Sequence, residues 1–284
     1  MAAIRDIKRH IKAVQSLRQM THALTQVAGA RARRYRIQLA EAWPYAQGLE
    51  RAMSLLTLRH GLQHPLLSCR EVGREIVVAI GSERGLCGAH NLEVLQRVRA
   101  MPRPQPGVKR DLLVVGSKLA ETCASHGMAV SRAVTRPRWG YAEEIDPLAT
   151  QLTVEYLQNS YQSATTVGFS RDVSGNKSVT MRALLPVRPA TAPVLSHLSP
   201  EIEPGSIDLL EHLVPRFIRS QLRVTFLQSM ALEEEARALA MQSATTNATE
   251  LLDGLTRRYR RARQDRITSE ILEVIATTDA GAAA

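Results

Sequence analysis

The last third of the chain carries a repeat that is too long for an ordinary globular helix. Mostly apolar seam positions recur every three or four residues from Ile207 to Val274, and neither Gly nor Pro lies between Phe217 and Asp253. A continuous helix over residues 206–277 would be about 108 Å long. Globular helices average only about 11–12 residues. We therefore expect this segment to form a coiled coil with a second long helix.

The first 60 residues supply a matching segment. Its apolar stripe has the same spacing and begins with Ile4, Ile7, Ile11 and Val14. Pro44 should kink or interrupt this helix, and Gly61 with Pro65 should end it. We expect the two segments to pack antiparallel. Residues near Ile11 and Val14 should then meet the stretch around Ile267 to Val274, or slightly before it.

Residues 70–195 follow a different pattern, in which short apolar runs alternate with helical segments. Expected strands are 75–80, 112–115, 129–133, 164–169 and 178–185, and expected helices are 89–100, one from about 117, and 143–160. Such alternation predicts a mostly parallel sheet covered by helices. The predicted fold class is therefore α/β. It consists of a long antiparallel coiled coil of N- and C-terminal helices (1–60 and 206–277) with an inserted Rossmann-like α/β domain (70–195).

The positive charge of the chain is unevenly distributed. The net charge is +10, and residues 1–59 contain 11 Lys or Arg against 3 Asp or Glu. A candidate basic belt comprises Arg31, Arg33, Arg34, Arg36, Arg257 and Arg258. It is either a solvated helix exterior or a surface that faces acidic partners or phosphates. The acidic run Glu233–Glu235 is expected to be a solvated helix face.

A glycine-rich loop, Gly81–Gly88, follows the first expected strand but fits no nucleotide-binding template. Counted from Gly81, a Walker loop needs Gly and Lys where Leu86 and Cys87 stand, and the Gly-x-Gly of a dinucleotide fold is absent. We therefore expect a tight turn in which Gly85 and Gly88 adopt unusual backbone angles.

No catalytic or metal-binding constellation stands out in the sequence. Cys87 lies near His90, but no third group is evident to orient them. The three cysteines are widely separated and form no CxxC or Cys/His cluster. We expect no catalytic residue, no cofactor and no metal. No apolar stretch approaches 18 residues and the first residues are basic, so we also expect neither membrane insertion nor a signal peptide.

Three stretches resemble the gamma subunit of F-type ATP synthase, the central rotor shaft. They are residues 4–24, residues 82–91, and residues 235–248 with their continuation through 259–271. The resemblance covers nearly the whole chain in the family's order. Departures, such as Glu83 where the family usually has Asp, suit a divergent second-copy or sodium-type version. The coupling ion, proton or sodium, is left open because the membrane ring sets it.

The resemblance implies a non-catalytic subunit that carries torque between the membrane c-ring and the alpha/beta hexamer, beside the epsilon subunit. It implies a peripheral position on the cytoplasmic side of the bacterial inner membrane. The basic belt would face acidic loops of the hexamer. Arg84, Cys87 and Asn91 are candidates for a rotor-foot interface, although Arg84 could instead attach the loop to the terminal helices of its own chain.

A nucleic-acid-binding protein with a basic helical arm is the alternative function. The net charge and the arginine clusters favour it. Aromatic residues make up only 4% of the chain, so base-stacking platforms are scarce, and no known binding motif is present.

Overall fold

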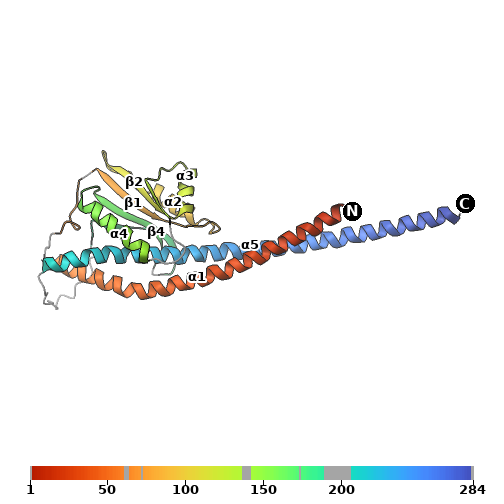
Figure 1. Cartoon of the computed structure of the whole chain (residues 1–284), viewed down its shortest axis with the longest axis horizontal. Helices are drawn as coiled ribbons and strands as arrows, with labels where there is room; N and C mark the ends of the chain where they lie inside the picture. The colour runs from red at the N-terminus through yellow and green to blue at the C-terminus, as the bar shows by residue number, and fades with distance from the viewer. Residues whose placement is uncertain are drawn as a thin grey trace. The chain divides into compact units, whose positions relative to one another are not determined.

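The computed structural model describes residues 2–60, 64–71, 73–135, 142–172, 174–188 and 206–282. These residues form two long terminal helices and a sheet domain that lies between the two helices in the sequence (Figure 1). The elements in order are α1 (Ala2–His60), β1 (Arg74–Ile80), α2 (His90–Arg99), β2 (Lys109–Val115), α3 (Ser117–Ser125), β3 (Arg132–Val134), α4 (Ala142–Leu157), β4 (Ser163–Arg171), β5 (Lys177–Leu185) and α5 (Ser206–Ala282).

The described sheet has five strands in the order β3-β2-β1-β4-β5. Three of the four neighbouring pairs are parallel, and only β4 and β5 run antiparallel. Strand β1 lies in the middle, paired to β2 from Arg74↔Lys109 to Ile80↔Val115. Its hydrophobic run is buried on both faces, as a central parallel strand requires.

Helices cover both faces of this sheet. Ile76, Val78 and Ile80 of β1 belong to a core cluster that also contains buried residues of α1, α4 and α5. The alternate residues Val77 and Ala79 belong to a second cluster with residues of α2 and α3. Because neighbouring residues of a strand point to opposite faces, β1 anchors two separate hydrophobic layers.

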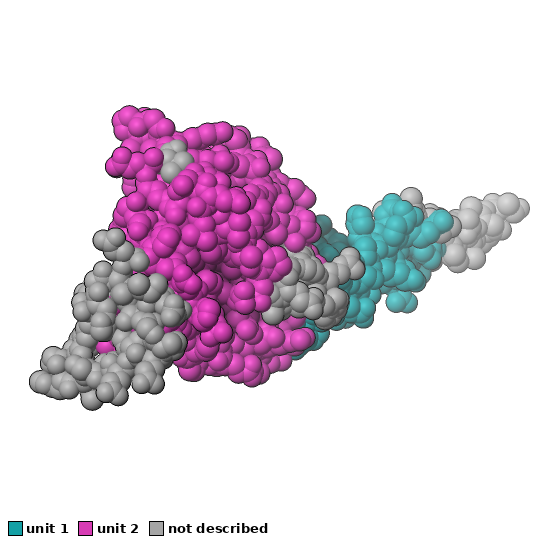
Figure 2. Space-filling model, turned by 60° about the vertical axis from the view of Figure 1, so that its left-hand side comes forward, with its two compact units in different colours: residues 1–28, 238–284 teal, residues 29–237 magenta. Residues whose placement is uncertain are grey.

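The chain divides into two compact units, coloured in Figure 2: residues 29–237, and residues 1–28 with 238–284. In the unit 29–237, magenta in Figure 2, Leu49 and Met53 of α1 share a core cluster with Val214 and Ile218 of α5. In both units, therefore, a piece of the N-terminal helix packs on a piece of the C-terminal helix. The predicted fold class is confirmed. The division into domains at 1–60, 70–195 and 206–277 stays a prediction, and residues 189–195 of the central segment lie outside the described residues.

Polar and small residues form the seam of the unit that contains both chain ends. Thr245 Oγ1 donates to Thr21 Oγ1 at 2.8 Å. Ala28, two turns after Thr21, and Ala248, one turn after Thr245, are both buried. Antiparallel pairing through Thr21 and Thr245 puts Ile11 level with about residue 255. Ile11 is therefore level with a part of α5 that precedes Ile267. This agrees with the second form of the expectation, in which the contact lies slightly before residues 267–274.

The pairing expected at Ile267 itself is wrong. Ile267 and Ile271 are about half exposed, at 44% and 54%. The physical reason is visible in Figure 1, where α5 continues beyond the N-terminus of α1. The side chain of Val274 lies outside the described residues.

Two prolines lie inside the long helices without ending them. Pro44 falls within α1 and Pro215 within α5. The interruption expected at Pro44 is therefore absent. A proline removes one backbone donor, and burial of Ala46, Leu49 and Met53 just after it offsets that loss. No helix in the described residues is long and apolar enough to cross a membrane.

Candidate functional site

The loop between β1 and α2 leaves the carboxyl end of the central strand. Ligand sites of open α/β sheets are commonly built at this edge. Here the space is filled by the chain itself. A Cβ on Gly81 would lie 2.6 Å from Cβ of Leu119, and one on Gly116 would lie 2.7 Å from the carbonyl oxygen of Ser82. These two glycines let the turn after β1 pack against Leu119 and the turn after β2 pack against the Ser82 backbone.

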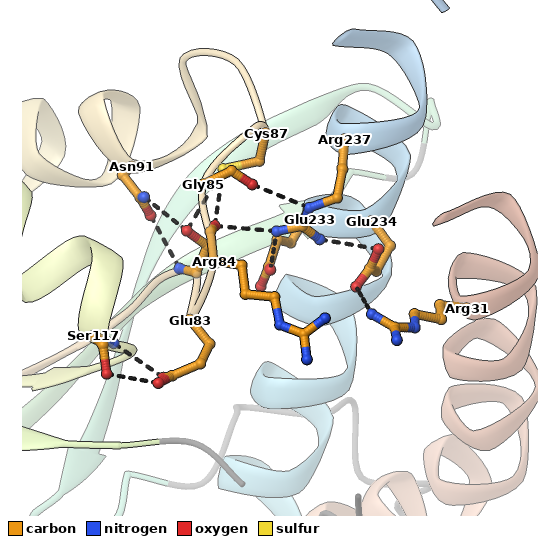
Figure 3. Close-up of polar contacts among 11 residues, drawn as sticks. Arg31, Glu83, Arg84, Gly85, Cys87, Asn91, Ser117, Glu233, Glu234 and Arg237 are labelled. Atoms are coloured by element: carbon orange, nitrogen blue, oxygen red, sulfur yellow. Dashed lines mark hydrogen bonds and ion pairs between the residues drawn. The ribbon is translucent and has the colours of Figure 1, made fainter. Parts of the chain in front are cut away.

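Asn91 and Ser82 form the inner bracket of the loop. The Ser82 amide donates to Asn91 Oδ1 at 3.0 Å, and Asn91 Nδ2 donates to Ser82 Oγ at 2.7 Å (Figure 3). Both residues are buried, and Cys87 is buried with its Sγ 3.5 Å from Ser82 Oγ. Cys87 and Asn91 therefore shape the loop from inside. The predicted partner contact stays a prediction, and among these three candidates Arg84 is the one with an exposed side chain.

Glu83 joins the loop to the start of α3. Its carboxylate accepts hydrogen bonds from the Ser117 amide at 3.0 Å and the Ser117 hydroxyl at 2.6 Å. A carboxylate at a helix N-terminus satisfies free amide groups and is favoured by the helix dipole. The contact therefore fixes one side of the loop to the neighbouring helix.

Arg237 of α5 holds the other side of the loop. Its Nε donates to the carbonyl oxygen of Gly85 and its Nη2 to that of Arg84, both at 3.2 Å. The same guanidinium contacts Glu233 Oε1 at 2.8 Å and Glu234 Oε2 at 2.9 Å. We call this set the arginine clamp (Figure 3). It binds backbone atoms, so it depends on the path of the loop and not on its side chains.

The arginine clamp is buried and electrically compensated. The side chains of Arg237, Glu233 and Glu234 are 9%, 2% and 8% exposed. Burial alone would lower the pKa of Arg237, but Glu233 and Glu234 outweigh it, and the pKa is raised above its usual value. The cation is therefore held in the folded state. Glu233 and Glu234 are not the solvated face that we expected, because a buried arginine needs nearby carboxylates.

The acidic run also reaches the N-terminal helix and the sheet. Glu234 Oε1 lies 3.7 Å from Nη1 of Arg31 on α1, and Glu235 Oε1 lies 3.7 Å from Nε of Arg36 on the same helix. Glu235 also accepts a hydrogen bond from Arg171 of β4. Arg31 and Arg36 are thus engaged within the chain. They contribute less to an outward-facing belt than the sequence suggested.

The other members of the predicted belt are exposed. Arg33 and Arg34 lie on α1 in the unit 29–237, and Arg257 and Arg258 lie on α5 in the other unit. In the part of the chain that the structure describes, none of these four makes an ion pair. Their role toward a partner stays a prediction.

Arg84 and Leu86 form the outer surface of the loop. In the described residues the Arg84 guanidinium makes no hydrogen bond or ion pair. Its backbone carbonyl accepts hydrogen bonds from Arg237 Nη2 (Figure 3) and from Cys87 Sγ. Leu86 is 62% exposed and has φ of 64°. The unusual angles expected at Gly85 and Gly88 occur at Leu86 and Gly88. Arg237, not Arg84, attaches the loop to the C-terminal helix.

Sequence reasoning missed the arginine clamp, although a signal was present. Glu233 and Arg237 are four residues apart, so they share a face of a helix. Nothing in that spacing reveals that the loop at residues 84–85 lies against this face. Across the described residues, no group of three or more His, Cys, Asp or Glu side chains is arranged to hold a metal ion.

Comparisons with known proteins cover almost the whole chain. Residues 3–281 match the family model described as ATP synthase. The gamma chain of Heliobacterium modesticaldum is 33% identical, over 97% of this chain and 98% of that protein. The gamma chain of Prosthecochloris aestuarii is also 33% identical, over 99% of both chains.

Solved structures with the same fold come from a mitochondrial enzyme. A chain of the Euglena gracilis mitochondrial ATP synthase, in a structure titled OSCP/F1/c-ring, aligns with a TM-score of 0.69 over 98% of this chain and 94% of that one, at 16% identity. A chain in the rotor structure of the same enzyme aligns with a TM-score of 0.66 over 94% and 99%, at 15% identity. Taken with the family model and the relatives of 30% identity or more, this shows that the chain belongs to the family of ATP synthase gamma chains.

Proposed function

We propose that this chain is the central shaft of a rotary F-type ATP synthase. It transmits torque between an ion-translocating membrane ring and a catalytic hexamer of alpha and beta subunits, and it is itself non-catalytic. Family membership supports the assignment. The observation that carries the mechanical role is the arginine clamp, in which the buried Arg237 of α5 donates hydrogen bonds to two backbone carbonyls of the α/β-domain loop.

Torque transmission needs a stiff connection between the sheet domain and the shaft. Inside the unit 29–237, one face of the sheet shares a hydrophobic core with α1 and α5. The arginine clamp adds directional bonds to that core, and Glu234 and Glu235 extend them to Arg31 and Arg36. Because protein interiors are close-packed and resist compression, a force on the domain is passed to both helices with little slack.

We infer that Arg84 provides the contact between the loop and a neighbouring subunit at the foot of the rotor. An exposed guanidinium on a loop with a fixed backbone can bind a carboxylate with two parallel hydrogen bonds. The c-ring and the epsilon subunit are the expected neighbours. Arg33, Arg34, Arg257 and Arg258 are proposed to face acidic loops of the alpha/beta hexamer. The complex would lie on the cytoplasmic side of a bacterial inner membrane, with this chain as a peripheral subunit.

A rotation assay tests the function directly. Cys69 is exposed, whereas Cys87 and Cys123 are buried, so a maleimide probe on the assembled complex should label Cys69. With the hexamer fixed to a surface, the probe should turn in one direction while ATP is hydrolysed. A Cys69→Ser complex treated with the same probe should stay unlabelled on this chain, and it controls for nonspecific probe attachment. A complex that hydrolyses ATP while a firmly attached probe stays still would contradict the proposal.

The nucleic-acid-binding alternative is not supported. The relatives that match are gamma chains over nearly their full length. The arginines that suggested it are also partly used within the chain, since Arg31 and Arg36 are paired with carboxylates of α5.

A further inference from the structure

A charged groove lies between α1, α4 and α5 in the unit 29–237, away from the arginine clamp. Its volume is about 390 Å³, within the range of ligand pockets. It is lined by Glu41, Ala42 and Tyr45 of α1, Asp146 of α4, and Arg216, Arg219, Ser220 and Arg223 of α5. We call it the three-arginine groove. Three guanidiniums face two carboxylates, so the groove carries a net positive charge.

The three arginines form a row along one face of α5. They stand at i, i+3 and i+7, which is the spacing of a single helix face, and the row spans roughly 10 Å between its ends. The middle one is neutralised, because Arg219 Nε lies 3.2 Å from Asp146 Oδ1. Arg216 and Arg223 are exposed, and neither makes an ion pair within the described residues. The groove therefore presents two exposed cations, Arg216 and Arg223, beside the Arg219–Asp146 pair and the carboxylate of Glu41.

The opposite wall supplies an aromatic surface. Tyr45 is 58% exposed and lies one helical turn after Glu41 on α1. A large exposed aromatic ring beside two guanidiniums suits an occupant with an aliphatic stem between charged groups. At the floor of the groove, Ser220 is buried and its hydroxyl donates to the carbonyl oxygen of Phe217 at 2.8 Å, so this hydroxyl is already used as a donor within α5.

We propose that the three-arginine groove binds an acidic segment of a partner protein, through two carboxylates about 10 Å apart. In an extended chain that separation corresponds to two residues three positions apart. The Cα atoms of Arg216 and Arg223 lie roughly 10 Å apart along α5, so each guanidinium can take a separate carboxylate. The planar guanidinium fork binds carboxylates with two parallel hydrogen bonds, so each end of the row selects one acidic side chain.

This site is separate from the contact proposed for Arg84. Arg84 lies on the loop after β1, whereas the groove lies on the helices that pack against one face of the sheet. The two proposals therefore fail independently. Loss of the groove contact would leave the arginine clamp and the loop intact.

Two synthetic peptides of equal composition and charge test the spacing with the full-length chain. One, Pro-Glu-Pro-Pro-Glu-Pro, holds its carboxylates roughly 9 Å apart in an extended polyproline conformation. The other, Pro-Pro-Glu-Glu-Pro-Pro, holds them together. Fluorescein-labelled versions are titrated by anisotropy at low salt. We expect the spaced peptide to bind about fivefold tighter, since one further exposed ion pair contributes up to about 1 kcal/mol.

Arg216→Gln and Arg223→Gln should each remove this preference, whereas Arg97→Gln, an exposed arginine on α2, should leave it unchanged. Equal binding of the two peptides would overturn the proposal. So would stronger competition by inorganic phosphate or by a single-stranded oligonucleotide than by the spaced peptide. Either result would assign the groove to another anion.

A second measurement uses the assembled complex. A photo-reactive phenylalanine replacing Tyr45 should cross-link to a segment of another subunit that contains Asp or Glu residues three positions apart. A cross-linked segment without acidic residues would contradict the inference. The peptide titration needs no complex, so it separates failure of this inference from failure of the rotor function.

Discussion

Replacing Arg237 by Met is the sharpest test of the arginine clamp. Met is similar in length and apolar, so the change removes the charge and the donors while largely filling the same space. The Arg84 and Gly85 carbonyls lose their donor, and the two buried carboxylates Glu233 and Glu234 lose their shared cation. The loop would then lose the hydrogen bonds that join it to α5.

The expected loss of unfolding free energy is about 4 kcal/mol. Removing one partner of a buried ion pair costs about 3–5 kcal/mol, because the remaining charge is buried without compensation. Arg237 is 9% exposed and Glu233 is 2% exposed, so solvent screening gives little relief. Arg31 Nη1 still lies 3.7 Å from Glu234 Oε1 and partly compensates this carboxylate, so the expected loss is in the middle of the range and not at its top. A change of this size in a unit of this length corresponds to roughly 8–16 °C in Tm.

Hydrogen exchange measured by mass spectrometry on the purified chain localises the effect, and urea unfolding followed by circular dichroism gives its size. The chain has two compact units, so a single transition cannot be assumed. We expect faster exchange in residues 81–91 and 229–241, with little change in residues 10–25. Arg97→Met, on the exposed side of α2, is the matched control and should alter the unfolding free energy by less than about 0.5 kcal/mol.

A double variant separates the ion pair from simple packing. In Glu233→Gln/Arg237→Met one of the two buried carboxylates is neutralised together with the loss of its partner, so part of the lost stability should return. The coupling energy between the two positions should be at least about 2 kcal/mol. A loss below about 1 kcal/mol in Arg237→Met, with unchanged exchange in residues 81–91, would refute the clamp as a structural connection.

Three further outcomes follow from the same structure. Arg84→Ala in the assembled complex should reduce ion pumping much more than ATP hydrolysis, with Arg97→Ala as control; equal loss of both with poor assembly would favour a purely structural role. Gly81→Ala should cost about 1–3 kcal/mol in urea unfolding, because its Cβ would overlap Leu119, whereas Gly48→Ala, with open space around it in α1, should stabilise the chain by about 0.5–1 kcal/mol. Burial, reinforced by Glu155, raises the pKa of Tyr161, so the folded chain retains this phenolic proton. The unfolding free energy should therefore fall as the pH rises above about 10, the pKa of an unfolded tyrosine, and Tyr161→Phe should flatten that decline in unfolding titrations.

The fold class could be predicted because its signals are local and periodic. A stripe at every third or fourth position specifies a helix whatever its partner is, and this predicted both terminal helices. Alternating apolar runs and helical segments predicted the sheet domain, with strands such as 75–80 close to the observed Arg74–Ile80. The interruption allowed for at Pro44 does not occur, because helix propensity is a local quantity and burial of the next turns outweighs it.

The interior of the candidate site could not be predicted in the same way. Gly85 and Gly88 were expected to carry the turn, yet Leu86 takes the left-handed conformation. Glu233 and Glu234 looked like a solvated face because acidic runs on helices usually are. Their burial depends on Arg237 reaching a loop about 150 residues earlier in the chain.

By itself the sequence determined the two long terminal helices, the presence of an α/β insertion, and the uneven placement of positive charge. These properties follow from composition and period along the chain. Only the tertiary structure decided which arginines stay available. Arg31 and Arg36 look the same as Arg33 and Arg34 in the sequence, but the first two lie beside carboxylates of α5 and the others do not. The physical reason is that a charge is engaged or free according to what lies within a few ångströms, and packing between distant segments sets that distance.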